Sequence, residues 1–251
     1  MLSPCLKYLY NEGYKVDIMV RDIAIKSGLL KHCPYVGDLI EIKNPWVSHI
    51  EGGWDAFEDQ MTANIGIYND LMEIEGYEFG GMVLRHPDNI PKIITNAKDL
   101  NLPIRDLDLE VFISDDYEDM AGKWVEQNYK DGFIFKHNSE NHAEHRFDFD
   151  EWIDKNLPDL PIVTERTMWD NHEKLCEVDI NLSFAIMKRA THRAVGVSIM
   201  FHAADAMQID VDVAYVGNSN RKIFPLDTFD GRIKNFMEID EWIVKDGKKI
   251  K

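Results

Sequence analysis

The stretch VGVSIMFHAADAM, residues 195–207, joins a buried strand to a helix and decides how the second half of the chain folds. Its first residues are β-branched and typical of a strand end, whereas the run from His202 to Ala206 is helix-prone and small-sided. In an open α/β sheet, ligands collect at the carboxyl ends of strands, where loops lead into helices. A helix start offers free main-chain N–H groups that suit a phosphate. The stretch therefore predicts a diphosphate site with Ser198 and His202 as side-chain donors; a buried helix start is the alternative.

Composition places the chain among globular proteins and excludes several functions. The 251 residues are 45% hydrophobic and 29% charged, which suits two packed domains. A net charge of -17 argues against a nucleic-acid partner. The first residues, MLSPCLKYLY, do not resemble a signal peptide, and no apolar run approaches the roughly 20 residues of a membrane span. We therefore expect a cytoplasmic protein with at most peripheral membrane contact.

The three cysteines, Cys5, Cys33 and Cys176, are widely spaced and form no CxxC pair. This spacing predicts reduced thiols rather than a disulfide framework or a cysteine zinc site.

Helix and strand signals alternate along the chain, which is typical of parallel sheets covered by helices. In the first part, the predicted helices are 3–11, 23–33 and 89–102, and the predicted strands are 14–20, 36–42 and 109–114. In the second part, the predicted helices are 115–129, 147–156, 181–190 and 201–208, and the predicted strands are 132–138, 160–167, 193–200 and 211–217. Residues 229–251 are predicted to form one or two helices and a basic tail. An α/β protein of two units, 1–112 and 113–251, is the simplest interpretation.

The segment 181–225 resembles the C-terminal domain of glycosyltransferase family 9, the heptosyltransferase-like enzymes. That family has a helix, a strand ending in a D-S-G turn, an H-x-A-x-A motif, and a second strand leading to a glycine and a proline. The matching positions here are Ser198, His202, Ala204, Ala206, Gly217 and Pro225. Residues 1–42 also look like that family, with a P-x-L-x-x-L helix followed by a strand, a helix and a strand after a proline.

The resemblance implies two Rossmann-like domains of the GT-B type, of which the N-terminal one is incomplete. It implies an acceptor-side domain over 1–112 and a nucleotide-sugar-binding domain over 113–251. The implied reaction is transfer of a sugar, with inversion, from a nucleotide-diphosphate sugar to a glycan or lipid-linked acceptor, with no cofactor and no metal. The implied donor-binding residues are Lys136, Ser198, Met200, Phe201, His202, Gly217 and Asn218. Lys136 ends the predicted strand GFIFK, near the place where the family has a basic residue.

Two departures from the family pattern affect the expected chemistry. Val197 and Ile199 replace the aspartate and glycine of D-S-G, which implies the loss of a donor-sugar contact. The family also has an L-G-D loop before the SPCL helix, and its aspartate is the implied general base, whereas this sequence begins at Met1, after that loop. The general base is therefore unassigned, and a truncated chain and a degenerate relative remain open alternatives.

A histidine-rich segment, residues 136–151, supports a different interpretation. His142 and His145 lie three residues apart, which permits a shared metal, and His137 precedes them. The segment can be a solvated polar loop, the lining of a donor cleft, or the metal site of a metal-dependent hydrolase. A non-catalytic module that binds nucleotide sugars is the other alternative to a glycosyltransferase.

Overall fold

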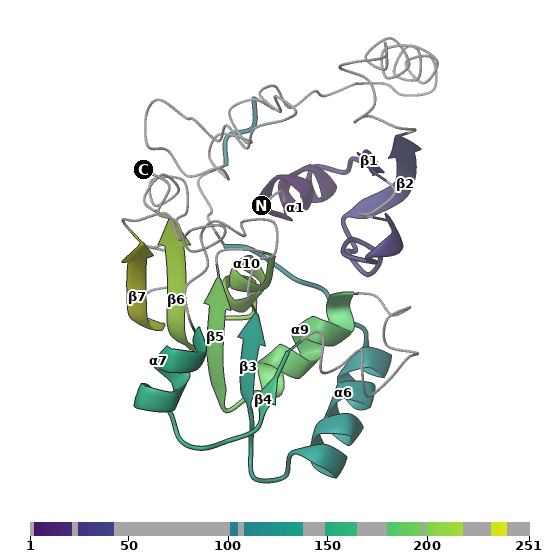
Figure 1. Ribbon diagram of the computed structural model, residues 1–251. Coiled ribbons are helices and arrows are strands. Elements are labelled where there is room, and N and C mark those ends of the chain that lie inside the picture. Colours follow the sequence, from purple (N-terminus) through teal and green to yellow (C-terminus); the bar gives the residue numbers. More distant parts are fainter. Residues whose placement is uncertain are drawn as a thin grey trace, which may run out of the picture. The chain divides into compact units, whose positions relative to one another are not determined.

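The protein folds as two compact units of helices and parallel strands. The computed structural model describes residues 3–21, 25–42, 101–104, 108–137, 149–164, 180–196, 199–217 and 232–239. The two units are Met1–Leu107 and Asp108–Lys251. Both contain helices and strands that pair in parallel, so the predicted α/β class is confirmed (Figure 1). The acceptor-side and donor-side roles of 1–112 and 113–251 stay predictions.

The first unit is built on a parallel pair of strands. Among the described residues its elements are α1 (Ser3–Asn11), β1 (Val16–Arg21) and β2 (Val36–Ile42). α1 buries Cys5, Leu6 and Leu9 on one face, and the chain leaves the helix through Gly13, whose φ of 89° lies in the left-handed region. The strands pair from Val16 opposite Val36 onward, so their carboxyl ends lie at the same edge.

The helix predicted over 23–33 is wrong over most of its described length. Helical geometry is limited to Ile25 and Lys26, and residues 27–32 form turns. Gly28 adopts a φ of 69°, and its N–H donates to the carbonyl of Ile25. A glycine in the left-handed region ends a helix, and the Ser27-Gly28 pair therefore outweighs the apolar periodicity around it.

The second unit contains a five-stranded sheet in which every strand pair is parallel. Its elements are α6 (Asp115–Asn128), β3 (Ile134–His137), α7 (Phe149–Asn156), β4 (Ile162–Val163), α9 (Ile180–Arg189), β5 (His192–Gly196), α10 (Ile199–Ala206), β6 (Val211–Gly217) and β7 (Ile233–Ile239). The strand order is β4-β3-β5-β6-β7. The first strand of this unit, β3, is therefore interior. β4 pairs with it on one side, and β5, β6 and β7 follow in that order on the other side.

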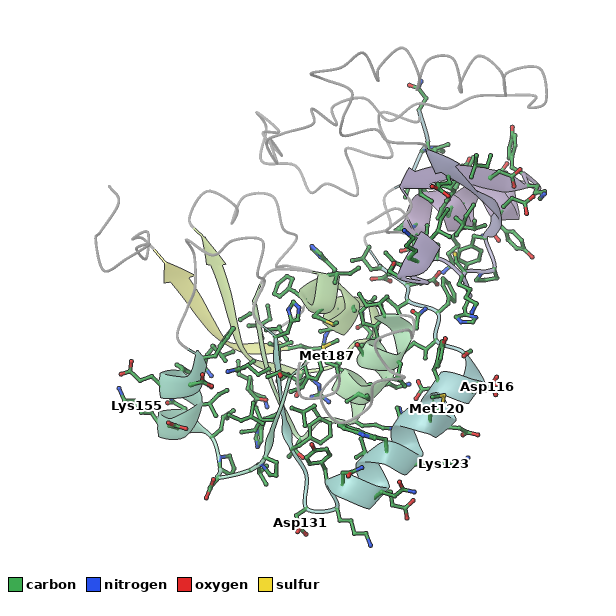
Figure 2. The ribbon with its side chains drawn as sticks, turned by 45° about the vertical axis from the view of Figure 1, so that its right-hand side comes forward. Asp116, Met120, Lys123, Asp131, Lys155 and Met187 are labelled. Carbon is green, nitrogen blue, oxygen red and sulfur yellow. The ribbon has the colours of Figure 1, made fainter. Side chains whose placement is uncertain are left out.

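Helices cover both faces of this sheet. α7 packs on one face, where Phe149 and Ile153 form a buried cluster with Ile134, Ala194 and Val213 from three strands. α9 contacts both α6 and α10 on the other face (Figure 1). Figure 2 shows Asp116 and Lys123 of α6 pointing outward and Met187 of α9 turned inward, where it is fully buried. The unit is thus a doubly wound layer structure.

Two predictions for this unit are wrong. Residues 109–114, predicted as a strand, join no sheet among the described residues; they lead to Ser114, which caps α6 by accepting a hydrogen bond from the N–H of Tyr117. Residues 233–239, predicted as part of a helix, form β7, which pairs with β6 along its whole length. The strand IKNFMEI gains ladder hydrogen bonds from β6 that periodicity within the segment does not reveal. β5 also ends at Gly196, earlier than predicted, because α10 begins at Ile199.

Charged groups hold the amino-terminal edge of this sheet together. Asp212, near the start of β6, is buried and accepts hydrogen bonds from the Arg193 main chain and from Lys234 Nζ, both at 2.9 Å. His192 Nδ1 lies 3.2 Å from the same carboxylate. Burial opposes ionisation of Asp212, but these donors outweigh it and hold its pKa below the usual range.

Candidate functional site

The strand order locates one crevice where a ligand is expected. In a doubly wound sheet, ligands bind outside the carboxyl ends of the strands, at the point where the chain reverses its direction of winding. Here that point lies between β3 and β5, because β4 follows on one side of β3 and β5 on the other. His137, the last residue of β3, is opposite Val195 of β5, and α10 begins three residues after β5 ends. This edge is the candidate site.

Lys136 lies at this edge but is already paired. Its side chain is on the α7 face of the sheet, since alternate strand residues point to opposite faces and Ile134 packs against α7. Its Nζ donates to Asp150 Oδ1 at 2.6 Å, and only 16% of the side chain is exposed. A phosphate at this edge would therefore compete with a carboxylate for the Lys136 ammonium.

His202 lies in the first turn of α10, as predicted for the H-x-A-x-A histidine. Its ring is partly buried and meets the Phe201 ring edge-on, with centroids 5.6 Å apart. Burial lowers its pKa from 6.5 to about 3. The imidazole is therefore neutral at physiological pH, so it can donate or accept a hydrogen bond but brings no positive charge to a diphosphate.

The other residues of α10 offer main chain rather than side chains. Met200 and Phe201 are buried, with relative exposures of 0% and 1%. Both lie in the first turn of α10. Because their side chains are buried, Met200 and Phe201 could contact a donor only through their main chain. Ile199, the first helical residue, is 37% exposed at the same edge.

The remaining predicted donor residues fall at or beyond the described strand ends. Gly217 ends β6 at the same edge of the sheet, next to β5. Ser198 and Asn218 lie outside the residues that the structure describes. Donor binding by the seven predicted residues stays a prediction.

His137 was given a possible role only in the histidine-rich segment, yet it ends β3 at the crevice. The signal for this position was its place next to the end of the predicted strand 132–138. Within the described ranges, no three His, Cys, Asp or Glu side chains gather so that they could hold a metal ion. His142 and His145 are outside those ranges, so the metal-site alternative stays untested.

Two further observations bear on the earlier expectations. Cys5 and Cys33 are free, buried thiols, and Cys176 is not among the described residues. In the part of the chain that the structure covers, every helix is too short or too polar to be a candidate for crossing a bilayer.

Similar proteins are found when the structure is compared with solved structures, but not when the sequence is compared with known families and proteins. No protein-family model and no curated protein matches the chain. A glycosyl transferase family 9 structure from Veillonella parvula DSM 2008 is similar, with a TM-score of 0.53 and 12% identity over 98% of this chain and 86% of that one. ADP-heptose lps heptosyltransferase II from E. coli has the same TM-score and 15% identity, over 98% of this chain and 88% of that one. The resemblance to glycosyltransferase family 9 is thus confirmed at the level of the fold.

Proposed function

We propose that this protein is a glycosyltransferase of the GT-B type that binds a nucleotide-diphosphate sugar at the carboxyl edge of the five-stranded sheet. The observation that carries the proposal is the strand order, which reverses between β3 and β5 at the edge where α10 begins after β5. Main-chain N–H groups there suit the diphosphate, whose negative charge grows as the sugar leaves. The similarity of the fold to family 9 structures supports the same assignment.

In this proposal, the second unit holds the donor and the first unit provides the acceptor side of a pair of Rossmann-like domains. Met200 and Phe201 contribute amides, His202 a neutral hydrogen-bonding group, and Lys136 a cation that Asp150 releases when phosphate binds. The acceptor is a glycan or a lipid-linked saccharide, and transfer inverts the anomeric centre. The residue that deprotonates the acceptor hydroxyl is unassigned.

A non-catalytic nucleotide-sugar-binding module is the second candidate, and one observation favours it. Lys136 is neutralised by Asp150, and His202 is neutral. Leaving-group departure needs positive charge or strong donors at the diphosphate. The Lys136–Asp150 pair has no net charge, and the His202 ring is neutral. The described edge is therefore better suited to bind a diphosphate than to stabilise it as a leaving group.

The test is a thermal-shift titration with ADP, UDP, GDP, CDP and TDP. A nucleotide at a hundred times its dissociation constant adds about 2.7 kcal/mol of stability, which raises the melting temperature measurably. We expect one nucleotide to stabilise the protein, and Lys136→Ala and His202→Ala to weaken its binding.

Lys155→Ala is the matched control for Lys136→Ala. Lys155 forms an ion pair with Glu151, and both residues lie on α7, the helix that also contains Asp150. Unlike Lys136, both members of this pair are exposed. Equal affinities of Lys136→Ala and Lys155→Ala for the nucleotide would remove Lys136 from the site. Absence of any nucleotide effect on the wild-type protein would overturn the proposal. Binding without release of nucleoside diphosphate from a sugar donor would favour the non-catalytic module.

A further inference from the structure

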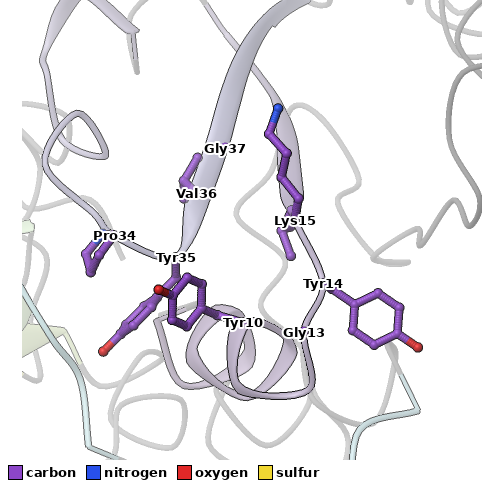
Figure 3. A pocket seen from close by; sticks show the side chains of 9 residues that line it. Tyr10, Gly13, Tyr14, Lys15, Pro34, Tyr35, Val36 and Gly37 are labelled. Carbon is purple, nitrogen blue, oxygen red and sulfur yellow. The ribbon is translucent and has the colours of Figure 1, made fainter.

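A depression of about 300 Å³ lies in the first unit, at the edge opposite the carboxyl ends of its strands. Its walls come from the end of α1 and from the amino-terminal ends of β1 and β2, and include Tyr10, Tyr14, Tyr35 and Lys15 (Figure 3). The volume is at the lower end of the range for small-molecule sites. The depression shares no residue with the candidate site, because its lining belongs to the first unit and the candidate site to the second.

Tyrosine rings give the depression an exposed aromatic surface. Tyr10 and Tyr14 are 50% and 49% exposed, which is unusual for large side chains with so much apolar area. Tyr10 and Tyr35 pack together, with ring centroids 5.4 Å apart, and Figure 3 shows Tyr14 on the other side of Gly13. Packing of Tyr35 against Tyr10 restrains the latter ring, so a ligand that covers it loses little side-chain entropy on binding.

The charged residue that lines the depression, Lys15, is paired with two carboxylates from the adjoining strands. Lys15 Nζ lies 2.9 Å from Asp38 Oδ2 and 3.5 Å from Asp17 Oδ1. The Asp38 N–H donates to Asp17 Oδ1 at 2.7 Å. One ammonium and two carboxylates repel a phosphate and provide no unbalanced cation to attract it. Their remaining lone pairs and protons suit the hydroxyl groups of a neutral ligand.

Gly37 keeps this polar group in place. A Cβ on Gly37 would lie 2.3 Å from Asp17 Oδ1 and 2.5 Å from Lys15 Cε, closer than such atoms approach. The Asp17 carboxylate and the Lys15 chain therefore occupy the space that a side chain at position 37 would take. The absence of a side chain at Gly37 therefore leaves room for this charged pair next to the depression.

We propose that this depression binds a neutral saccharide, with the C–H face of a pyranose ring on Tyr10 or Tyr14 and its hydroxyls on the Lys15–Asp38 pair. The C–H bonds of a pyranose carry partial positive charge, which the negative faces of aromatic rings attract. This site goes beyond the proposed function, because it requires neither a nucleotide nor the crevice at β3 and β5. For a protein that transfers sugars, it would be a second place at which a saccharide binds.

The test is saturation-transfer NMR with the methyl glycosides of glucose, galactose and mannose, with choline and inorganic phosphate as comparison ligands. We expect at least one glycoside to receive saturation at its ring protons, with a dissociation constant of about 1 mM. Tyr14→Ala and Tyr10→Ala should each weaken binding about fivefold or more, whereas Tyr14→Phe should retain it. Met120→Ala is the matched control, because Met120 is a large side chain, 44% exposed, on α6 of the other unit.

The outcomes separate this site from the proposed function. Glycoside binding that Lys136→Ala leaves unchanged supports the inference even if no nucleotide stabilises the protein. The inference is overturned if no glycoside receives saturation, or if Tyr10→Ala and Tyr14→Ala bind as well as Met120→Ala. Binding of choline alone would assign the rings to a cation instead, and would equally overturn the saccharide.

Discussion

Replacing Arg193 with methionine should destabilise the second unit more than any surface change. The guanidinium of Arg193 is buried and donates to four main-chain carbonyls, those of Met187 (2.9 Å), Lys188 (2.8 Å), Ala190 (2.7 Å) and Asp210 (3.1 Å). Met187 and Lys188 belong to the last turn of α9, whose carbonyls have no partner within the helix. One side chain thus joins the end of α9 to the loop before β6.

The magnitude follows from those four bonds. A hydrogen bond from a charged donor contributes about 1.5–3 kcal/mol, but burial of the guanidinium offsets part of this, as its lowered pKa shows. Loss of one partner from such a buried charged arrangement costs about 3–5 kcal/mol. Arg193→Met retains much of the volume, so the loss measures the hydrogen bonds rather than a cavity.

Urea unfolding followed by circular dichroism measures the effect. With a slope of about 2 kcal/mol per molar urea, the midpoint should fall by about 2 M. Lys155→Met is the control, since its pair with Glu151 is exposed to solvent and its loss should leave the midpoint almost unchanged. A loss below about 1 kcal/mol in Arg193→Met would show that water replaces the guanidinium and would refute this account.

Two further predictions concern a titration and a turn. The folded pKa of His202, about 3, is below its unfolded value near 6.5, so its contribution to stability is complete above pH 6.5 and is lost as the pH falls toward 3. NMR should show no titration of the His202 ring between about pH 8 and 5 in the folded protein, and a midpoint near 6.5 would contradict its burial. Gly132→Ala should cost about 1–3 kcal/mol, because φ is 99° and the new Cβ would lie 2.3 Å from Thr191 Oγ1. Gly13→Ala, with φ of 89° and open space around it, isolates the backbone strain, and an equal loss in both variants would exclude the contact with Thr191.

The elements that the sequence predicts well have local signals. β2 and β6 match their predicted bounds, 36–42 and 211–217, because each is rich in valine, isoleucine and other strand-forming residues. α6 begins where predicted because Ser114 is a strong cap and acidic residues fill the first turn. The class of the fold and the element types at these positions could therefore be read without coordinates.

Errors occur where a distant partner decides the structure. Residues 233–239 form the strand β7 because they pair with β6. The sequence of this segment alone does not indicate that pairing. The strand order, which places His137 at the crevice, is likewise a property of the sheet as a whole.

The candidate site shows the same limit. Lys136 was identified from its position at a strand end, but its pairing with Asp150 depends on how α7 packs. The neutral state of His202 depends on burial that a motif cannot report. Sequence therefore predicts which residues reach the edge, while packing decides their charge.

The buried charges around Asp212 and Arg193 are all near the amino-terminal ends of β5, β6 and β7, whereas the crevice is at the carboxyl ends. Hydrogen bonds that hold the sheet are thus spatially separate from residues that would meet a ligand. Substitutions at strand ends and in the loops after them can then accumulate at little cost in folding stability. Such a division lets substrate preference diverge between descendants of one ancestral scaffold while the scaffold itself persists.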